Sequence, residues 1–378
     1  MRIAQQVWTQ ESGWRRVGDA EAGDAQLVFC FAAPGAWQAA SAHVHLSALY
    51  PHARIVGCTT GGEILGAEVH DGWVVATAVR FDSVRVAVAT AELDESGRSQ
   101  AAGRVLGEGL PPQGLRAVFV MADGMRTNGS GLIEGLRLAL PADVLITGGL
   151  AGDGADFRTT YVACDGAPRQ GMAVAVGFYG EGLRLGCGSF GGWDRFGPAR
   201  RITRSAGNVL YELDDGPALA LYKRYLGDEA AGLPGSALLF PLAVRPSGDE
   251  HSAIVRTIVG IDEDTQSMTF AGDIPQGWEA QLMRGHFDGL VEGASRAGDA
   301  AAMSGARGTT LALLVSCIGR KLLMGQRIVD EVEAVADSLG GRAVMTGFYS
   351  YGEIAPHSFT GRCELHNQTM TVTTIGEA

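Results

Sequence analysis

Two glutamates at matching positions are the first residues of this sequence whose type and spacing could do chemistry. Glu63 lies near the end of the glycine-rich segment GCTTGGEI (57–64), and Glu353 lies near the end of the similar segment GFYSYGEI (347–354). Each segment follows an apolar run typical of a buried strand, and a carboxylate there could bind a ligand amine or act as a general acid or base. Alternatively, each acid accepts hydrogen bonds from nearby backbone N–H groups and holds its own loop.

Further candidates lie beside these acids in the C-terminal part of the chain. Tyr349 and Tyr351 alternate with a serine and either line a pocket with rings and hydroxyls or pack in the core. Arg320, in the segment SCIGRK, could stabilise the negative charge of a ligand, or of the neighbouring Cys317 as a thiolate. The apolar context of Cys317 favours an inert core thiol.

Two histidines are candidates for binding a metal or haem. His366 forms a C-x-x-H pair with Cys363, which supplies too few ligands for a closed zinc site, but an imidazole alone can be the axial ligand of a haem. His286 lies in EAQLMRGHFDGLVEGA (279–294), which is predicted to be helical, next to apolar residues that could contact a macrocycle. The alternative for either histidine is an ordinary structural side chain.

The usual enzyme signatures are missing from the sequence. The segment GCGSFG (186–191) matches a dinucleotide-binding pattern, but no helix is predicted to begin at its last glycine, and such a helix is needed to hold a pyrophosphate. A bend at a strand end is therefore the better interpretation. The chain carries no P-loop, H-E-x-x-H, G-x-S-x-G or paired C-x-x-C motif.

A repeated pattern of strand, helix, strand and glycine-rich loop positions these residues. The pattern occurs at 27–31 with 54–64, and again at 312–318 with a helix at 326–339 and a strand at 343–354. A weaker third copy runs through 117–124, a helix at 131–140 and the segment VLITGGLAGDG (144–154), which carries Asp153. The three loops therefore carry an acid each.

Alternating or continuous apolar runs predict further strands, mostly as hairpins. The predicted pairs are 73–81 with 84–90, 172–180 with 183–189, and 253–261 with 267–271 around the turn DEDTQ, and a final half-buried strand covers 364–375. The fold class predicted is mixed α/β, with two related halves in which βαβ units and β-hairpins form sheets covered by helices. The polar, turn-rich stretch around 195–215 places the boundary between the halves.

Composition narrows the class of protein. The 378 residues suffice for about two domains, and an apolar fraction of 46% is enough to bury a sizeable core. The formal net charge of −12 disfavours nucleic acid and anionic membrane surfaces as partners. Six scattered cysteines, the lack of an apolar run of spanning length and the lack of a signal peptide predict a soluble, cytoplasmic protein with reduced thiols.

Several linked motifs in the expected order resemble the FIST family of sensory domains. They are GCTTGGEI (57–64), ITGGLAGDG (146–154), GNVLYELDDGPALALY (207–222), SCIGRKLLMGQR (316–327), GFYSYGEI (347–354) and ELHNQTMT (364–371). The resemblance divides the chain into an N-terminal extension (1–25), a FIST N-like domain (26–205) and a FIST C-like domain (206–378). Tyr349, Glu353 and His366 are candidate residues that lie inside these motifs.

The resemblance implies a sensor without catalytic activity. Free-standing bacterial members of the family are described as haem-binding nitric oxide sensors that regulate a histidine kinase, so haem, nitric oxide and a kinase partner are expected, with His366 or His286 as the metal ligand. A second hypothesis is a sensor of a small metabolite such as an amino acid, with Glu353 facing the amine and Arg320 the carboxylate. The third is an enzyme that uses Glu63 or Glu353 as acid or base. The expected partners are a signalling protein and a small-molecule or gas ligand.

Overall fold

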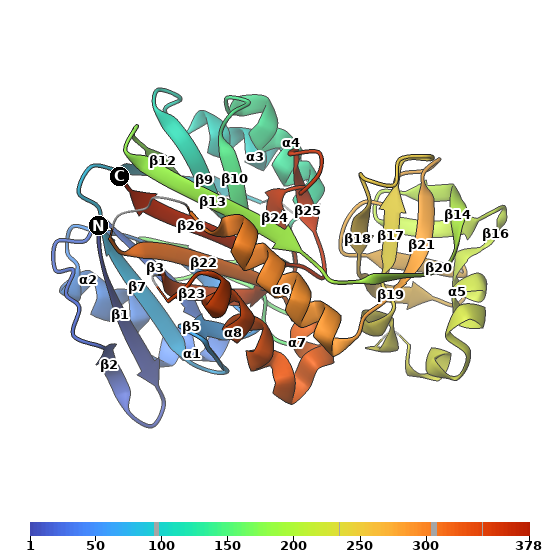
Figure 1. The fold of residues 1–378 in the computed structure, drawn as a ribbon, viewed down its shortest axis with the longest axis horizontal. Helices are drawn as coiled ribbons and strands as arrows, with labels where there is room; N and C mark the ends of the chain where they lie inside the picture. The colour runs from blue at the N-terminus through green and yellow to red at the C-terminus, as the bar shows by residue number, and fades with distance from the viewer. Residues whose placement is uncertain (94–97, 234, 304–307, 342) are drawn as a thin grey trace.

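A computed structural model describes residues 1–93, 98–233, 235–303, 308–341 and 343–378. It confirms a mixed α/β fold, with four sheets and helices that cover them. Three sheets form a large body that contains both chain ends, and the fourth forms a smaller domain beside it (Figure 1). That smaller domain consists of strands β14 to β21 with the short helices between them.

The first sheet has the strand order β11-β4-β3-β7-β1-β2. Its strands are β1 (Arg2–Thr9), β2 (Gly13–Val17), β3 (Leu27–Ala32), β4 (Arg54–Thr59), β7 (Val74–Arg80) and β11 (Val162–Cys164), and it is covered by α1 (Pro34–Ala39) and α2 (Ala42–Leu49). The predicted N-terminal extension therefore supplies two strands of this sheet.

The second sheet has the order β25-β24-β10-β9-β12-β8. Its strands are β8 (Arg85–Glu92), β9 (Leu115–Ala122), β10 (Leu145–Leu150), β12 (Met172–Tyr179), β24 (Glu353–Pro356) and β25 (Cys363–His366). Helices α3 (Ser99–Glu108) and α4 (Gly129–Ala139) pack together on its outer face.

The third sheet has the order β13-β26-β22-β23-β5-β6. Its strands are β5 (Glu63–Leu65), β6 (Glu68–His70), β13 (Leu183–Phe190), β22 (Thr310–Cys317), β23 (Ala343–Ser350) and β26 (Met370–Glu377). Helices α6 (Phe287–Ala301) and α8 (Ile328–Ser338) cover it, and α7 (Ile318–Met324) with the 3₁₀ turn η3 (Gly325–Arg327) leads from β22 into α8.

The fourth sheet, which defines what we call the small domain, has the order β18-β17-β21-β14-β15-β20-β19, with β16 paired to β15. Its elements are β14 (Asp194–Ala206), β15 (Val209–Leu213), β16 (Gly216–Pro217), α5 (Ala218–Leu226), η1 (Gly227–Gly232), η2 (Gly235–Leu239), β17 (Leu242–Arg245), β18 (Ile254–Arg256), β19 (Ile258–Asp262), β20 (Ser267–Phe270) and β21 (Glu279–Arg284). The predicted boundary between residues 205 and 206 falls at the end of β14.

The three sequence repeats are the three parallel strand pairs of the body, β3 with β4, β9 with β10 and β22 with β23. In each pair a glycine of the second strand faces the backbone of the first. A Cβ atom on Gly57, Gly148 or Gly347 would lie 1.8, 1.9 or 2.0 Å from the carbonyl oxygen of the residue opposite it. Only glycine allows strands to approach so closely, which explains why these glycines mark the repeats in the sequence.

Each repeat also lends strands to the next sheet in a cycle. After β4 the hairpin β5–β6 joins the third sheet beside β23, after β23 the hairpin β24–β25 joins the second sheet beside β10, and after β10 strand β11 joins the first sheet beside β4. The inner faces of the three sheets meet in one core, where Phe29 packs against Phe119 and Phe31 against Phe348 at ring distances of 5.6 and 4.8 Å.

Several sequence expectations need correction at the level of strand pairing. Strands β7 and β8 were expected to form a hairpin but belong to the first and second sheets, and β12 and β13 belong to the second and third. The final stretch is two strands, β25 and β26, in different sheets, and it is buried rather than half-buried. Local alternation cannot distinguish a strand that turns back from one that crosses to another sheet. The hairpin around the turn DEDTQ is confirmed for β19 and β20, whereas Ile254–Arg256, expected in the same strand as β19, forms the separate strand β18 and pairs with β17.

Two short linkers connect the small domain to the body and lie side by side. The first runs from β13 into β14 and the second from β21 into α6. Gly192 adopts a φ of +75°, and a Cβ atom on it would lie 1.8 Å from the carbonyl oxygen of Gly289. The Trp193 indole covers Gly285 and donates a hydrogen bond of 2.8 Å to the carbonyl oxygen of Gln368. The linkers are therefore packed against each other and against the body.

Candidate functional site

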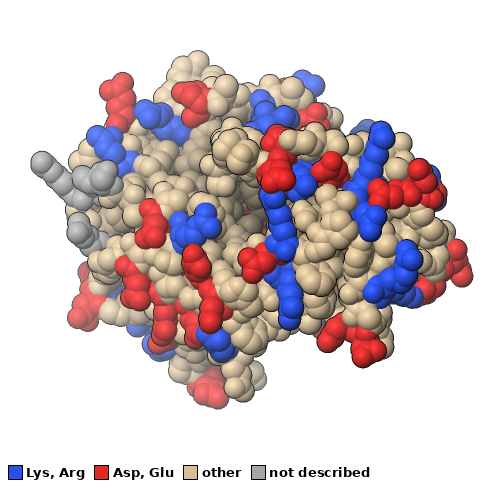
Figure 2. All heavy atoms as spheres, turned by 45° about the vertical axis from the view of Figure 1, so that its right-hand side comes forward, with Lys and Arg blue, Asp and Glu red and all other residues tan. Residues whose placement is uncertain are grey.

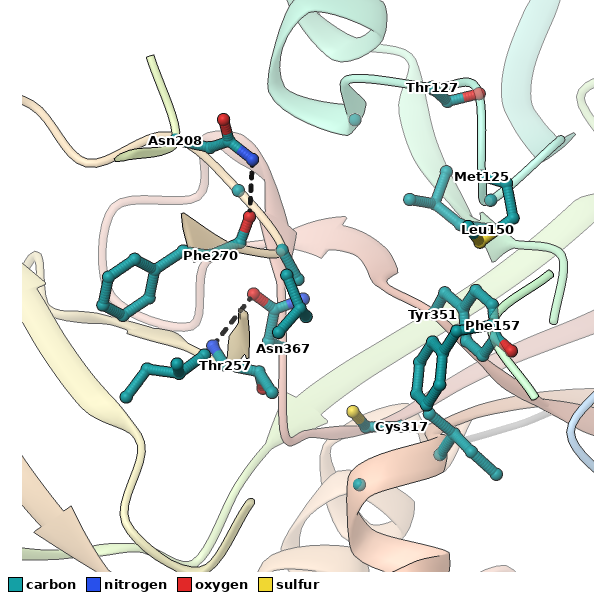
Figure 3. Close-up of a pocket in the computed structure, with 18 of the residues that line it drawn as sticks. Met125, Thr127, Leu150, Phe157, Asn208, Thr257, Phe270, Cys317, Tyr351 and Asn367 are labelled. Atoms are coloured by element: carbon teal, nitrogen blue, oxygen red, sulfur yellow. Dashed lines mark hydrogen bonds between the residues drawn. The ribbon is translucent and has the colours of Figure 1, made fainter. Parts of the chain in front are cut away.

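A cavity of about 930 Å³ lies between the body and the small domain. From the body it is lined by loops that follow strands β9, β10, β22, β23 and β25, and from the small domain by residues around β18 to β20. Figure 3 shows side chains of the small domain on one side of this space and side chains of the body on the other. Four of those body strands belong to parallel pairs whose carboxyl ends face the cavity, which is where α/β proteins commonly bind ligands.

The loop Gly124–Gly129 forms one wall and leads into α4. Asp123, buried just before it, accepts hydrogen bonds from the backbone N–H of Met125 at 3.0 Å and of Gly171 at 2.6 Å, and from the hydroxyl of Thr160. The Asn128 side chain caps α4 by accepting from the N–H of Gly131 at 2.9 Å, and its amide donates to Asp273 of the small domain at 2.9 Å. This wall is therefore held rigidly and tied across the cavity.

An aromatic pair forms the opposite edge of this wall. The ring of Phe157 stacks on that of Tyr351 with centroids 4.6 Å apart. The Tyr351 hydroxyl donates a hydrogen bond to the Asp153 carboxylate. Burial raises the pKa of Tyr351 above the usual range. Phe157 has a positive φ of 50° and is 40% exposed, although a left-handed backbone is strained for a bulky residue. Strain and exposure together make this ring a candidate for contact with a ligand.

Two buried polar groups in the cavity wall lack a hydrogen-bond partner. They are the amide nitrogen Nδ2 of Asn367, from the body, and the hydroxyl Oγ1 of Thr257, from the small domain. Asn367 is 1% exposed and Thr257 is 5% exposed. The Asn367 Oδ1 accepts from the Thr257 N–H at 3.4 Å, which joins the body to the small domain (Figure 3). An unpaired buried donor costs about 1–3 kcal/mol, so this contact between the body and the small domain is incompletely satisfied.

Other lining residues are already satisfied or apolar. The Asn208 amide donates to the carbonyl of Phe270 at 2.8 Å, as Figure 3 also shows. Cys317 lies at the start of α7, and burial raises the pKa of its thiol well above the usual range, so it is an uncharged group here. The sequence interpretation of Cys317 as an inert thiol agrees with this environment.

The mouth of the cavity combines exposed apolar side chains with a positive charge. Met125 and Val259 are 45% and 47% exposed, on opposite walls. Arg126 is the one charged residue among the described lining residues. The space-filling view shows the surface hollowed near its middle, with basic and acidic side chains around it (Figure 2). Exposed apolar side chains at the rim of a cavity are typical of a binding site.

Arg320 and Tyr349 do not line the cavity, because a buried network holds them. The Arg320 guanidinium pairs with the Glu331 carboxylate at 2.7 Å and donates to the carbonyl oxygens of Gly191 and Leu290. The Tyr349 hydroxyl donates to Glu331 at 2.9 Å, and burial raises the pKa of Tyr349. These residues join α7, α8, β23 and the linkers.

Glu353 and Glu63 hold their own loops in the same way. The Glu353 carboxylate accepts from the Ser350 hydroxyl at 2.7 Å and from the N–H of Thr369 at 3.1 Å. Glu63 accepts from the Thr60 hydroxyl and from the N–H of Trp73 at 3.1 Å. Burial raises the pKa of each to about 8. Neither lines the cavity, and the geometry matches the alternative in which each acid braces backbone N–H groups.

The two candidate histidines also lie outside the cavity lining. His366 Nε2 lies 3.1 Å from the carbonyl oxygen of Ala355, and burial lowers the pKa of this histidine to about 3. His286 was expected within a helix, but residues 279–284 form β21 and His286 is the cap of α6. Its Nδ1 accepts from the N–H of Gly289 at 2.9 Å and its Nε2 lies 3.2 Å from Asp194. The described residues contain no cluster of three potential metal ligands.

Of the predicted site residues, the structure brings only Tyr351 to the cavity wall. Sequence reasoning missed Asn367 and Thr257, whose pairing spans 110 residues, and also missed Met125, Arg126 and Phe157. A local signal existed for one of them, because Asn367 interrupts the alternation of an apolar strand pattern within ELHNQTMT.

The fold and cavity together define a mixed α/β protein in which a cavity lies between a body of three repeats and an attached β-domain. A model of the FIST N domain matches residues 26–216, and a model of the FIST C domain matches residues 218–356. This chain therefore belongs to the FIST family, whose domains are sensory domains of signal transduction.

Curated proteins and solved structures were also compared with this chain. No curated protein matches the chain. Among solved structures it is similar to cyanuric acid hydrolase from A. caulinodans, with 11% identity and a TM-score of 0.34 over 94% of this chain and 90% of that chain. Within the residues that the structure describes, no helix is both long and apolar enough to cross a membrane.

Proposed function

We propose that this protein is a non-enzymatic sensor whose small-molecule ligand binds in the cavity between the body and the small domain. The observation that carries the proposal is the composition of the cavity wall, to which the body contributes Met125 and Phe157 and the small domain contributes Val259. A ligand that contacts side chains of both parts would join them. Binding can shift their arrangement only by its different affinity for the two states.

The route from the cavity to the linkers is short. Gln368 follows Asn367 directly and has a left-handed backbone with a φ of 62°. Its carbonyl oxygen accepts from Trp193 of the first linker at 2.8 Å and from Arg320 at 3.3 Å. A change at the Asn367 side chain is therefore one residue away from the contacts that hold the small domain. We propose that this connection transmits the ligand signal to a partner signalling protein.

Haem and nitric oxide sensing remain a prediction that this cavity does not favour. The described lining residues include no histidine, and the Cys317 thiol is uncharged. His366 and His286 both hold partners within the protein. The two histidines therefore do not fit the role of an axial haem ligand in the cavity. Glu353 and Arg320 also lie outside the cavity lining, so the arrangement in which they bind an amino acid does not fit this cavity either. A hemin titration that gave a saturable Soret band would contradict this conclusion; regulation of a histidine kinase stays an expectation of the family resemblance.

The proposal is tested with Nile red, a neutral apolar fluorophore, and with hydrogen–deuterium exchange. We expect saturable fluorescence enhancement that falls in Phe157→Ala and Val259→Ala, because both side chains line the cavity mouth. Leu138→Ala is the control, since Leu138 is 67% exposed and lies outside the lining. Bound dye is also expected to slow exchange in the linkers at 190–194 and 284–287. Equal dye binding in all four proteins, or unchanged linker exchange, would overturn the proposal.

A further inference from the structure

The aromatic edge of the cavity bears on the class of ligand, given the ligand site proposed above. Asp153, the acid of the third repeat, fixes this edge. Its carboxylate accepts from the Tyr351 hydroxyl, and from the backbone N–H groups of Arg158 and Thr159 at 2.9 and 2.7 Å. One carboxylate therefore joins Tyr351 to the loop that carries Phe157.

The braced loop leaves the Phe157 ring partly open at the cavity. The ring packs on that of Tyr351, with centroids 4.6 Å apart and ring planes inclined by 17°. Phe157 lines the cavity and is 40% exposed, with a φ of 50°. A left-handed backbone is strained for a bulky residue, and here it holds an apolar ring at the surface instead of in the core. The cavity edge therefore carries a flat, fixed aromatic surface that is backed by a second ring.

The walls beside this ring are apolar and accessible. Val259 of the small domain is 47% exposed and lies at a β-bulge, since the register of β19 with β20 shifts between Ile258 and Gly260. A bulge re-aims a side chain out of the regular alternation of a strand. Met125 of the body is 45% exposed, and a thioether packs favourably against aromatic rings. Both side chains line the cavity together with Phe157.

We infer that the ligand of this cavity carries a planar aromatic ring, which stacks on Phe157 and contacts Met125 and Val259. Stacked rings attract each other beyond the apolar area that they bury. A saturated ring of the same size lacks this contribution, because its puckered carbons and their hydrogens cannot lie flat on the Phe157 face. The class recognised is therefore aromatic rather than aliphatic.

The test compares two alcohols in calorimetric titrations of the native protein. They are 2-naphthalenemethanol and decahydro-2-naphthalenemethanol, which share a carbon skeleton and differ in that only the first is planar. The saturated alcohol is the more hydrophobic, so burial of apolar area alone predicts that it binds more tightly. We expect the opposite order, with the aromatic alcohol binding below about 1 mM and at least about threefold more tightly than the saturated one.

Variants at one position locate the stacking. Phe157→Leu keeps an apolar side chain but removes the ring, so the affinity for the aromatic alcohol is expected to fall about three- to tenfold, with little change for the saturated alcohol. Phe157→Tyr keeps a ring and is expected to retain the native order. Leu138→Ala, outside the lining, is the control. Thermal unfolding without ligand shows whether each variant is folded, and the order of the two alcohols in the native protein tests the ligand class without any variant.

The outcomes separate the ligand class from the site. The aromatic class would be overturned by equal or tighter binding of the saturated alcohol, by equal losses for both alcohols in Phe157→Leu, or by binding of neither alcohol. Each of these results leaves the sensor site standing while Nile red binding still depends on Phe157 and Val259. Loss of that dependence would overturn the site itself.

Discussion

At the residue scale, Glu353 shows how a buried acid makes stability depend on pH. The Glu353 carboxylate accepts hydrogen bonds from Ser350 and Thr369. The charge of Arg320 lowers the pKa of Glu353, and the Glu353 charge in turn raises the pKa of the Cys317 thiol. Burial outweighs these effects and raises the folded pKa to about 8 from 4.5. The folded state therefore holds a proton that the unfolded state releases, so the free energy of unfolding falls as pH rises through this window.

We expect Glu353→Gln to flatten this dependence. The glutamine keeps an acceptor for Thr369 and has no charge to bury. Between about pH 5 and pH 8 the free energy of unfolding of the variant should therefore fall by less than that of the native protein, the difference being on the order of 1 kcal/mol or more. Urea unfolding at the two pH values measures the difference, with the exposed Glu134→Gln as control. Parallel pH profiles in all three proteins would contradict the raised pKa; Glu63 contributes an independent part of the slope.

The Arg320–Glu331 pair gives a second prediction at this scale. Both side chains are fully buried, and removal of one partner leaves an uncompensated charge. Glu331→Ala should therefore lower the free energy of unfolding by about 3–5 kcal/mol, whereas Glu331→Gln, which retains acceptors for Arg320 and Tyr349, should lose less. Denaturant titrations measure both, and an equal loss would contradict the expectation by showing that the hydrogen-bond acceptors contribute little beyond the charge.

At the element scale, the close approach of paired strands depends on glycine. A Cβ atom on Gly347 would lie 2.0 Å from the carbonyl oxygen of Leu314, which is backbone and cannot move aside. We expect Gly347→Ala to destabilise by about 3 kcal/mol or more, since few point changes exceed that value without such a cause. Gly35→Ala is the matched control, because nothing lies within 4 Å of its added Cβ atom.

These same glycines explain what the sequence made predictable. A glycine-rich loop after an apolar strand is a local pattern, so the parallel pairs β3–β4, β9–β10 and β22–β23 and the helices α4 and α8 were predicted close to their observed bounds. The destination of a strand is not local: β7 and β8 are joined by only a few residues yet enter different sheets. The cavity was missed for the same reason, because its polar pair unites Asn367 with Thr257 of another domain.

At the scale of the whole molecule, the parts of the chain on either side of residues 205 and 206 share two sheets. Strands β5, β6 and β13 complete the third sheet, and β24 and β25 complete the second. Separate fragments 1–205 and 206–378 should therefore each lack a compact core, while their co-expression should restore it. Near-ultraviolet circular dichroism and size-exclusion chromatography check this; two independently folded, monomeric fragments would contradict it.

The cyclic exchange of strands among the three repeats limits how such a protein can evolve. In a solenoid, repeats stack in an open row, so one more unit can be added at little cost. Here the strands that follow each repeat pair with the sheet of another repeat, and three such pairings close the cycle. A fourth unit would find the positions beside β4, β10 and β23 already occupied, and deletion of one unit would leave one of these positions empty and one set of strands without its sheet. Diversity in this architecture must therefore come from the loops at strand ends and from the attached domain, which are the parts that form the cavity.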